Sequence, residues 1–468
     1  MKRLLSTVAV VAIACAGGTG AFFLGAKPRP ALQPVPAVAA PPAPLTLACG
    51  GELQRTVDVG VNVSNVNESI SERTWVVAAA ASGTAPKVEI AGKGEVPRVG
   101  DIGFYSSGQG LAGVVRSETV TSGSLELAGA TVHTASAGDL RGVAANPCRR
   151  ARSDQWIVGS RSQVGVSNQL ILTNPGSNPV TVKVEALTAA GKAELGGTGT
   201  VVVDSGQSKR VSIDGALRDQ PRFALHVTTE SGSVAASLQQ TSLDGYTPAG
   251  VSFVTSSVAA RNVTVPGVRI DGGGSAALRI ANPNASPATV SVTALTDKGA
   301  STLPGGGKVT VEARSVLDLS LAGLPAGNVS FRIAGSADIV AGAEFTVKDG
   351  GQADNAWAAA GSARTAGSAV FGPTSATLVA VSKAGLPGSV TATPIDANGK
   401  DMPAVKADVN GQASLPMPEG AVAVRYTSTS PMYAGIASTA QVEGGKGVDW
   451  VPLGSSDVEE TSKHVAVG

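Results

Sequence analysis

The chain has very few of the residues that most often carry catalysis or bind metals. It contains three cysteines and three histidines, His133, His226 and His464, and no histidine lies at metal-ligand spacing from another or from a cysteine. The sequence also lacks a Gly-x-Ser-x-Gly turn and a glycine-rich phosphate loop that leads into a helix. We therefore expect a non-enzymatic protein with no cofactor and no bound metal.

Charge and aromatic rings are also scarce. Charged residues make up 15% of the chain and aromatic residues 3%, and the net charge is +1. The basic residues are scattered, which argues against a nucleic-acid partner. Few rings are left for a sugar-binding face, for which the candidates are Trp75, Tyr105, Tyr246, Tyr426 and Tyr433. The hydrophobic fraction of 43% is still enough to fill cores with Val, Ala, Leu and Ile.

One long apolar run is present, at the N-terminus. Two basic residues precede an apolar stretch from Leu4 to about Ala26, which at about 1.5 Å per residue can cross a hydrocarbon core of about 30 Å. We interpret residues 1–27 as an uncleaved signal anchor that crosses the membrane as one helix; cleavage after the run and lipidation at Cys15 are the alternatives. All three place the rest of the chain outside the cytoplasmic membrane, after a Pro/Ala-rich linker at residues 28–47.

The two remaining cysteines, Cys49 and Cys148, bracket the first folded region. An exported protein favours a disulfide between them, and two unpaired buried thiols are the alternative. Closing a loop of roughly 100 residues contributes about 4 to 5 kcal/mol on the chain-entropy model. We therefore expect residues 48–150 to form a disulfide-clasped, β-rich domain.

The rest of the chain carries internal repeats. The segment from Leu170 to Pro175, followed by a Val-x-Val-x-Ala-Leu-Thr-x-x-Gly pattern, recurs about 108 positions later from Leu278 to Pro283. An eroded third copy from Ala376 lacks the Asn-Pro pair. The alternation of apolar and polar positions predicts paired strands. The pairs Asn174-Pro175 and Asn282-Pro283 are typical of tight turns.

Aromatic residues recur at spacings of about a hundred residues, each a few positions before a Gly-Ser or Ser-Ser pair: Trp156, Phe253, Trp357 and Trp450. With about seven strand candidates per unit, the sequence predicts an all-β fold of tandem immunoglobulin-like β-sandwich repeats. The repeats would span residues 151–257, 258–362 and 363–456, before a flexible tail at 457–468. One ring seated at each junction would stiffen the array into a rod. A β-propeller made of half-unit blades is the alternative.

Several motifs resemble an actinobacterial family labelled domain of unknown function 5719. They are Asp139–Ala144, Asp154–Gly159, Leu170–Pro175, Val234–Gln240 and Gly250–Phe253, and the resemblance covers roughly residues 49–456. It implies one N-terminal membrane segment and an extracellular β-rich body. Because members of the family tend to be encoded near glycosyltransferase and mannose-metabolism genes, it also implies a connection with envelope polysaccharide.

We therefore expect a single-pass, membrane-anchored, extracellular scaffold or adaptor of the bacterial cell envelope, which holds a membrane partner such as a glycosyltransferase. A cell-wall or polysaccharide binding protein is the alternative. The two hypotheses differ in the surface that they need. A scaffold presents exposed apolar faces to a protein, whereas a polysaccharide binder presents a row of exposed aromatic rings.

Overall fold

The computed structural model is all-β, as the sequence predicts. It describes residues 37–39, 45–55, 70–80, 87–91, 94–95, 103–107, 112–118, 125–454 and 462–464. The chain divides into a small unit (residues 1–41 and 459–468) and a large body (residues 42–458). In the small unit, β1 (Ala37–Ala39) pairs antiparallel with β34 (Ser462–His464).

No helix within the described part of the chain is long and apolar enough to cross a membrane. The predicted anchor at residues 1–27 and Cys15 lie outside the described residues, as do most of the predicted linker and tail.

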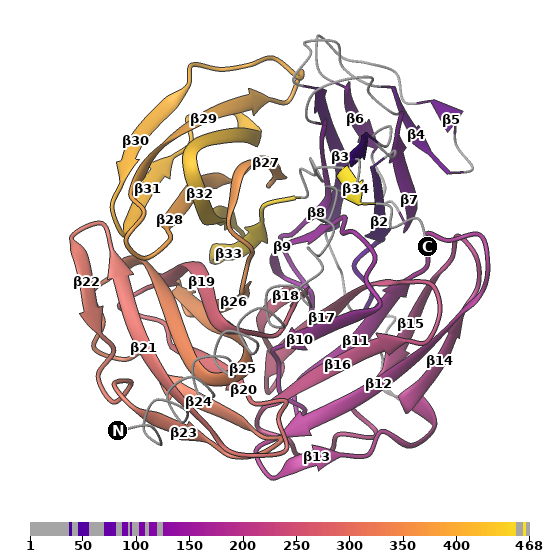
Figure 1. Ribbon diagram of the computed structural model, residues 1–468, viewed down its shortest axis with the longest axis vertical. Helices are drawn as coiled ribbons and strands as arrows, with labels where there is room; N and C mark the ends of the chain where they lie inside the picture. The colour runs from indigo at the N-terminus through magenta and orange to yellow at the C-terminus, as the bar shows by residue number, and fades with distance from the viewer. Residues whose placement is uncertain are drawn as a thin grey trace, which may run out of the picture. The chain divides into compact units, whose positions relative to one another are not determined.

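The body consists of four β sectors arranged around a common centre (Figure 1). The first sector, residues 45–147, has two four-stranded sheets. One sheet contains β2 (Thr46–Gly50), β7 (Ala112–Ser117), β4 (Val88–Ile90) and β5 (Gly94–Glu95); the other contains β6 (Gly103–Ser107), β3 (Ile70–Ala80), β8 (Leu125–Ala135) and β9 (Gly142–Pro147).

The second sector, residues 154–257, encloses its own core between two layers of strands. One layer is β13 (Gly191–Ala193), β12 (Val180–Thr188), β14 (Thr200–Val203), β16 (Phe223–Thr229) and β10 (Asp154–Val158); the other is β17 (Ala235–Asp244), β11 (Val166–Thr173) and β15 (Ser208–Ser212). The last strand, β18 (Thr247–Ser257), pairs with both β10 and β17. Buried and exposed residues alternate along most of β12, which is typical of a strand with one face on a core.

The third and fourth sectors repeat this plan with one long strand shared by both layers. The third contains β19 (Ala260–Ile270), β20 (Ala276–Ala281), β21 (Ala288–Thr296), β22 (Gly299–Thr302), β23 (Val309–Val311), β24 (Val316–Ser320), β25 (Gly327–Asp349) and β26 (Gln352–Ala359). The fourth contains β27 (Arg364–Val370), β28 (Ser375–Ser382), β29 (Gly388–Asp396), β30 (Val405–Val409), β31 (Gln412–Pro416), β32 (Ala421–Val442) and β33 (Gly445–Pro452). The long strands are β25 and β32, which pair with β21 and β29 over their first halves and with β20 and β28 over their second.

The sequence repeats occupy equivalent places in these sectors. The first copy forms β11 and β12, the second forms β20 and β21, and the eroded third forms β28 and β29. In each sector the first of these two strands pairs on one side with a short strand, which is β15, β24 or β31. On its other side it pairs with the strand that leads into the last hairpin, which is β17, β25 or β32.

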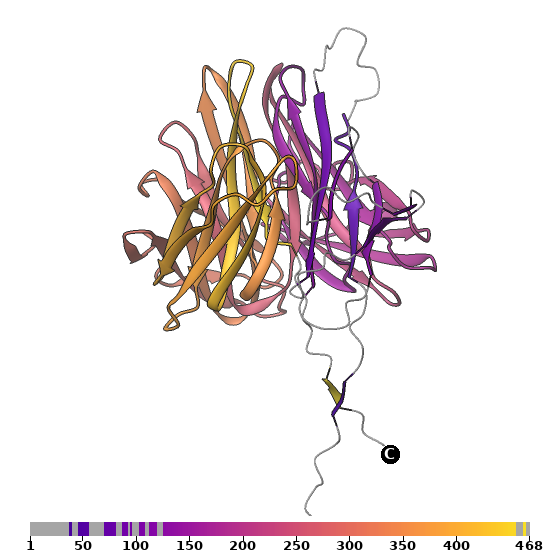
Figure 2. The same cartoon turned by 90° about the horizontal axis from the view of Figure 1, so that it is seen from above.

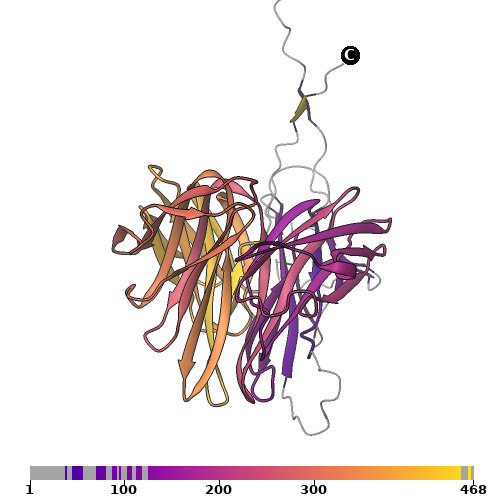
Figure 3. The same cartoon turned by 90° about the horizontal axis from the view of Figure 1, so that it is seen from below.

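The last strand of every sector lies at the centre of the body. These closing strands, β9, β18, β26 and β33, are grouped in the middle of Figure 1, and the strands run roughly along its line of view (Figure 2 and Figure 3). The first and fourth sectors also share one core, because Trp75 and Val132 of the first pack with Phe371 and Leu378 of the fourth. The expectation of a rod was therefore wrong: the sectors close into a ring. Each sector has two layers whose strands alternate along the chain, as β10, β12 and β16 do with β11, β15 and β17, so neither layer is a consecutive half of a repeat.

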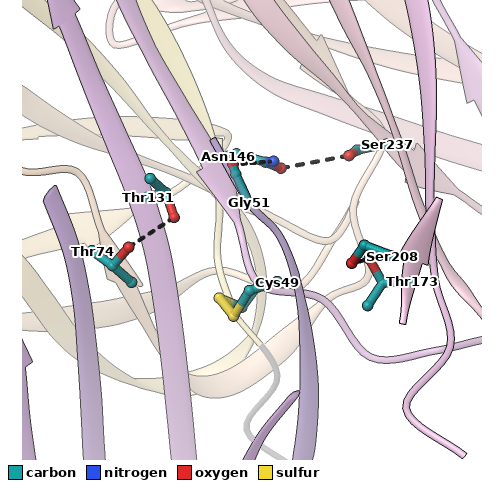
Figure 4. Close-up of a disulfide and its surroundings, with 9 residues drawn as sticks. Cys49, Gly51, Thr74, Thr131, Asn146, Thr173, Ser208 and Ser237 are labelled. Carbon is teal, nitrogen blue, oxygen red and sulfur yellow. Dashed lines mark hydrogen bonds between the residues drawn. A yellow bond between two sulfur atoms is a disulfide. The ribbon is translucent and has the colours of Figure 1, made fainter. Parts of the chain in front are cut away.

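Cys49 and Cys148 form the expected disulfide, with both residues buried in the core between the two sheets of the first sector (Figure 4). Beside it, Ala48 and Arg149 exchange two backbone hydrogen bonds of 2.8 Å. Asn146 extends toward the second sector, where its side chain contacts Ser237. The disulfide therefore fixes β2 against the segment that follows a central strand.

We predict that replacing both cysteines (Cys49→Ser with Cys148→Ser) lowers the free energy of unfolding by about 4 kcal/mol, because a loop of roughly 100 residues is released. Urea unfolding under oxidising conditions measures the loss, and the wild-type protein under reducing conditions is the matched control. A double variant as stable as the wild type would show that the clasp adds nothing to the ring.

Candidate functional site

The predicted junction aromatics do not all occupy one kind of place. Phe253, Trp357 and Trp450 lie on the closing strands β18, β26 and β33. Trp156 lies instead on β10, the opening strand of the second sector, where its ring stacks on His226 at 4.1 Å between centroids. Residues that are evenly spaced in the sequence therefore occupy two different positions, a closing strand in three cases and an opening strand in the fourth.

Each closing-strand aromatic packs against the sector that precedes its own. Trp357 belongs to the third sector but is buried in the core of the second, where its Nε1 donates a hydrogen bond to Gln240 at 2.9 Å. Trp450 of the fourth sector is likewise buried in the core of the third, with its Nε1 donating to the carbonyl of Pro266 at 2.8 Å. Phe253 packs beside Ala144 of the first sector. These rings join neighbouring sectors through apolar contact.

The two predicted Asn-Pro turns are held by buried asparagines. The Asn174 amide nitrogen donates to the carbonyls of Asn178 and Val203 at 2.8 and 3.0 Å, and its side-chain oxygen accepts from the Gly176 amide at 2.9 Å. Asn282 makes the same three kinds of bond in the third sector. Each asparagine thus ties a turn to a strand of the facing layer. Pro175 and Pro283 follow directly and fix the backbone there.

The eroded third copy has Ser382 and Lys383 at this place. The backbone amides of Asn174, Asn282 and Ser382 each donate to the carbonyl of the residue directly before the short partner strand, which is β15, β24 or β31, at 2.9, 2.9 and 3.0 Å. The Ser382 hydroxyl accepts from the Gly411 amide at 3.0 Å. The turn is therefore kept without the Asn-Pro pair, and a lysine stands where the other two copies have proline.

A single buried carboxylate joins all four sectors at the centre of the ring. Asp354, on β26, accepts hydrogen bonds from the backbone amides of Val143, Val251, Val448 and Asn355, at 3.0, 3.1, 2.9 and 2.9 Å. These amides come from β9, β18, β33 and β26 in turn. One side chain therefore satisfies a donor from every closing strand.

Glycine on the other three closing strands makes room for this carboxylate. Gly142, Gly250 and Gly447 each come directly before the valine whose amide binds Asp354. A Cβ at these glycines would approach an Asp354 carboxylate oxygen to 2.6, 3.0 and 3.0 Å, which is closer than such atoms normally come. One aspartate and three glycines therefore occupy equivalent positions around the centre.

A second carboxyl group lies close to the first. Asp449, on β33, is buried and accepts from the Ala145 amide at 3.0 Å. Burial raises the pKa of Asp354 to about 7, against the lowering effect of its backbone donors. Burial, together with the neighbouring Asp354, raises the pKa of Asp449 to about 8. The folded protein therefore binds protons here more tightly than the unfolded chain, in which an aspartate has a pKa near 3.9.

We predict that the free energy of unfolding falls as the pH rises from about 5 to about 8, because these raised pKa values favour folding below that range and the gain is lost as the carboxyls ionise. Asp449→Asn keeps an acceptor for Ala145 but removes one titration, so its stability should decline less steeply. Urea unfolding at several pH values tests this, with Asp408→Asn, an exposed strand position, as control. Equal slopes in all three proteins would contradict it.

At one end of the closing strands lies a cationic cavity of about 300 Å³, which we call the axial cavity. Residues that end or follow each closing strand line it, so all four sectors contribute, and residues of β19 and β32 complete its walls. It has five cationic side chains: Arg149, Arg150, Arg152, Arg364 and Lys383. Hydroxyl groups are the other common feature, from Thr255, Ser256, Ser257, Ser362 and Tyr433. Among the described residues of its lining, none is an aspartate, a glutamate or a histidine.

The arginines of the axial cavity act on one another. Burial, together with the charges of Arg152 and Arg364, lowers the pKa of Arg149 to about 10. The pKa of Arg364 is lowered by burial and then by Arg152 and Arg150. Because a guanidinium is a strong base, the protein holds several like charges together here. Such an arrangement costs free energy and is typical of a site that receives a charge of opposite sign.

One part of this cavity has a local signal in the sequence. Arg149, Arg150 and Arg152 follow Cys148 almost directly, and the clasp therefore fixes the start of a basic cluster. Arg364 and Lys383 lie more than two hundred residues away, and only the ring brings them to the same place. Asp354 and Asp449 have no such signal, because the sequence alone does not distinguish a buried aspartate from an exposed one.

The aromatic candidates for a sugar-binding face are scattered. Trp75 and Tyr426 are buried in the core shared by the first and fourth sectors. Tyr433 is half-buried in the axial cavity, and Tyr246 is fully exposed at a hairpin tip. The side chain of Tyr105 lies outside the described residues. The described rings therefore form no exposed row.

A comparison with curated proteins finds no match. Among solved structures, the full-length RrgB pilus protein from Streptococcus pneumoniae aligns at 8% identity over 84% of this chain and 88% of that chain, with a TM-score of 0.11, too low to support an argument. The model of a family of unknown function matches residues 106–419, about two thirds of the sequence. The chain therefore belongs to the family of unknown function DUF5719.

Proposed function

We propose that the protein is a non-enzymatic binding protein of the bacterial cell envelope, whose axial cavity holds an anionic ligand outside the cytoplasmic membrane. The observation that carries this proposal is the gathering of five cations from separate parts of the chain in one cavity. Its lining offers charge and hydroxyl groups but no carboxylate or histidine among the described residues, which favours binding over acid-base chemistry. The N-terminal apolar run and the disulfide support an exported, membrane-anchored protein.

The choice between the two sequence hypotheses follows from the surface. A polysaccharide binder that stacks sugars needs exposed rings, and the described rings form no such row. A polymer recognised by charge needs cations instead, which the axial cavity has. An acidic envelope polysaccharide or a charged group attached to one is therefore the ligand that we favour.

We predict that the full-length protein binds acidic polysaccharide and not a neutral glucan, with an affinity that falls as salt rises, because screening weakens attraction between the cavity and the anion. Calorimetric titration at two salt concentrations measures this. Equal binding of the neutral polymer, or no binding of either, would remove the support for an anion site.

A protein adaptor is the second candidate, and one surface feature favours it. Val164 and Tyr246 are fully exposed, with relative exposures of 100% and 102%, on two neighbouring turns of the second sector. A backbone hydrogen bond of 2.6 Å from Leu243 to Gly165 joins these turns. Val164 and Tyr246 are the most exposed large hydrophobic side chains among the described residues, and a partner protein that covered both turns would bury them.

We predict that a photo-crosslinking residue at Tyr246, introduced into the full-length protein in its native membrane, captures one membrane glycosyltransferase reproducibly. The same residue at Val202, an exposed position on β14, is the control. Identical products from both positions would show that the contact is not specific, and the adaptor hypothesis would then lose its support.

A further inference from the structure

Two buried hydroxyl groups in the lining of the axial cavity have no hydrogen-bond partner within the described structure. They are Thr255 Oγ1 and Ser257 Oγ, at the end of β18, and the residues are 1% and 9% exposed. A buried hydroxyl without a partner costs free energy unless something in the cavity bonds to it. These groups are neutral, so they indicate a ligand independently of the cationic charge.

The cations are arranged to meet several oxygens at once. Four of the five are arginines, whose planar guanidinium groups present parallel N–H donors that match the oxygens of carboxylate or phosphate groups. Arg149 is fixed by its backbone bonds to Ala48, and its Nη2 donates to the Ser256 carbonyl at 3.1 Å. Its guanidinium is therefore positioned before any ligand arrives.

The charge and size of the cavity narrow the class of ligand. A single phosphate monoester carries a charge of about −2 at neutral pH, and a carboxylate carries half of that. Arg149, Arg152 and Lys383 together supply enough positive charge for two phosphoryl groups, each with oxygens free to accept from arginine and from a hydroxyl. A cavity of about 300 Å³ is far larger than a single water needs, and it has room for a compact headgroup.

We propose that the axial cavity recognises a diphosphate group, with Arg149, Arg152 and Lys383 neutralising its charge and Thr255 and Ser257 donating to its oxygens. This inference rests on the proposed function, because it names the chemistry of the anion bound at the same site. The Ser382-Lys383 departure of the third repeat has a role in this arrangement, since it supplies a cation at a turn that is Asn-Pro in the other two copies.

The test is calorimetric titration of the full-length protein with inorganic pyrophosphate, and with citrate as a carboxylate anion of comparable charge. Pyrophosphate should bind at least about tenfold more tightly than citrate, since citrate lacks the tetrahedral oxygens. The titrations are repeated with Asp457→Asn, Glu459→Gln and Glu460→Gln combined, because these carboxylates follow the lining residue Leu453 closely in sequence. This removes any competition from the chain itself.

Charge variants locate the site. Arg152→Gln and Lys383→Gln, both at exposed side chains of the lining, should each weaken pyrophosphate binding at least fivefold, whereas Arg218→Gln, exposed and outside the lining, should not. Thr255→Val keeps shape and charge but removes a donor, so it should weaken pyrophosphate severalfold and leave citrate unchanged. The thermal unfolding midpoint of each variant reports whether it folds.

The outcomes distinguish a failure of diphosphate recognition from a failure of the anion site itself. Equal affinity for citrate and pyrophosphate, with loss in Arg152→Gln, would overturn diphosphate recognition and leave an anion site. If neither anion binds to the wild type or to the variant with Asp457, Glu459 and Glu460 replaced, both diphosphate recognition and the anion site would be overturned. Binding that is weakened equally by Arg218→Gln would place the anion elsewhere on the protein and overturn the assignment to this cavity.

Discussion

The structure depends on one carboxylate. Asp354 accepts backbone amides from all four closing strands, and three glycines at equivalent positions leave space for it. An apolar side chain there would leave four buried donors unsatisfied, and larger residues in place of the glycines would collide with it. The centre of the ring is thus a shared hydrogen-bonded site, and no sector completes it alone.

Apolar contacts between sectors complete the closure. Trp357 and Trp450 are each buried in the core of the preceding sector, and Trp75 joins the first sector to the fourth. Hydrophobic burial of this kind has no direction, whereas the hydrogen bonds to Asp354 fix how the strands are aligned. Together these interactions keep the four closing strands aligned with one another. The segments that follow these strands therefore meet at one end of the body.

The axial cavity is a consequence of that convergence. Arg149 follows β9, Ser257 ends β18, Ala359 ends β26 and Pro452 ends β33, so every sector contributes to the walls. The closed ring offsets the repulsion between these arginines, which an isolated loop of such composition would relieve by spreading apart. The favourable interactions at the centre thereby offset the unfavourable clustering of charge in the axial cavity. Such clustering does not help the chain to fold, and it is typical of a functional site.

The sequence by itself determined the all-β fold, the repeated strand pairs, the Asn-Pro turn segments and the disulfide, because these depend on residues close in the chain or on a choice between two cysteines. It did not determine the ring. Whether consecutive sectors extend as a rod or close on one another depends on contacts such as Val143 to Asp354, between residues more than two hundred positions apart. The cavity was out of reach for the same reason: no local pattern relates Arg149 to Arg364 or Lys383, and only the tertiary structure places their charges together.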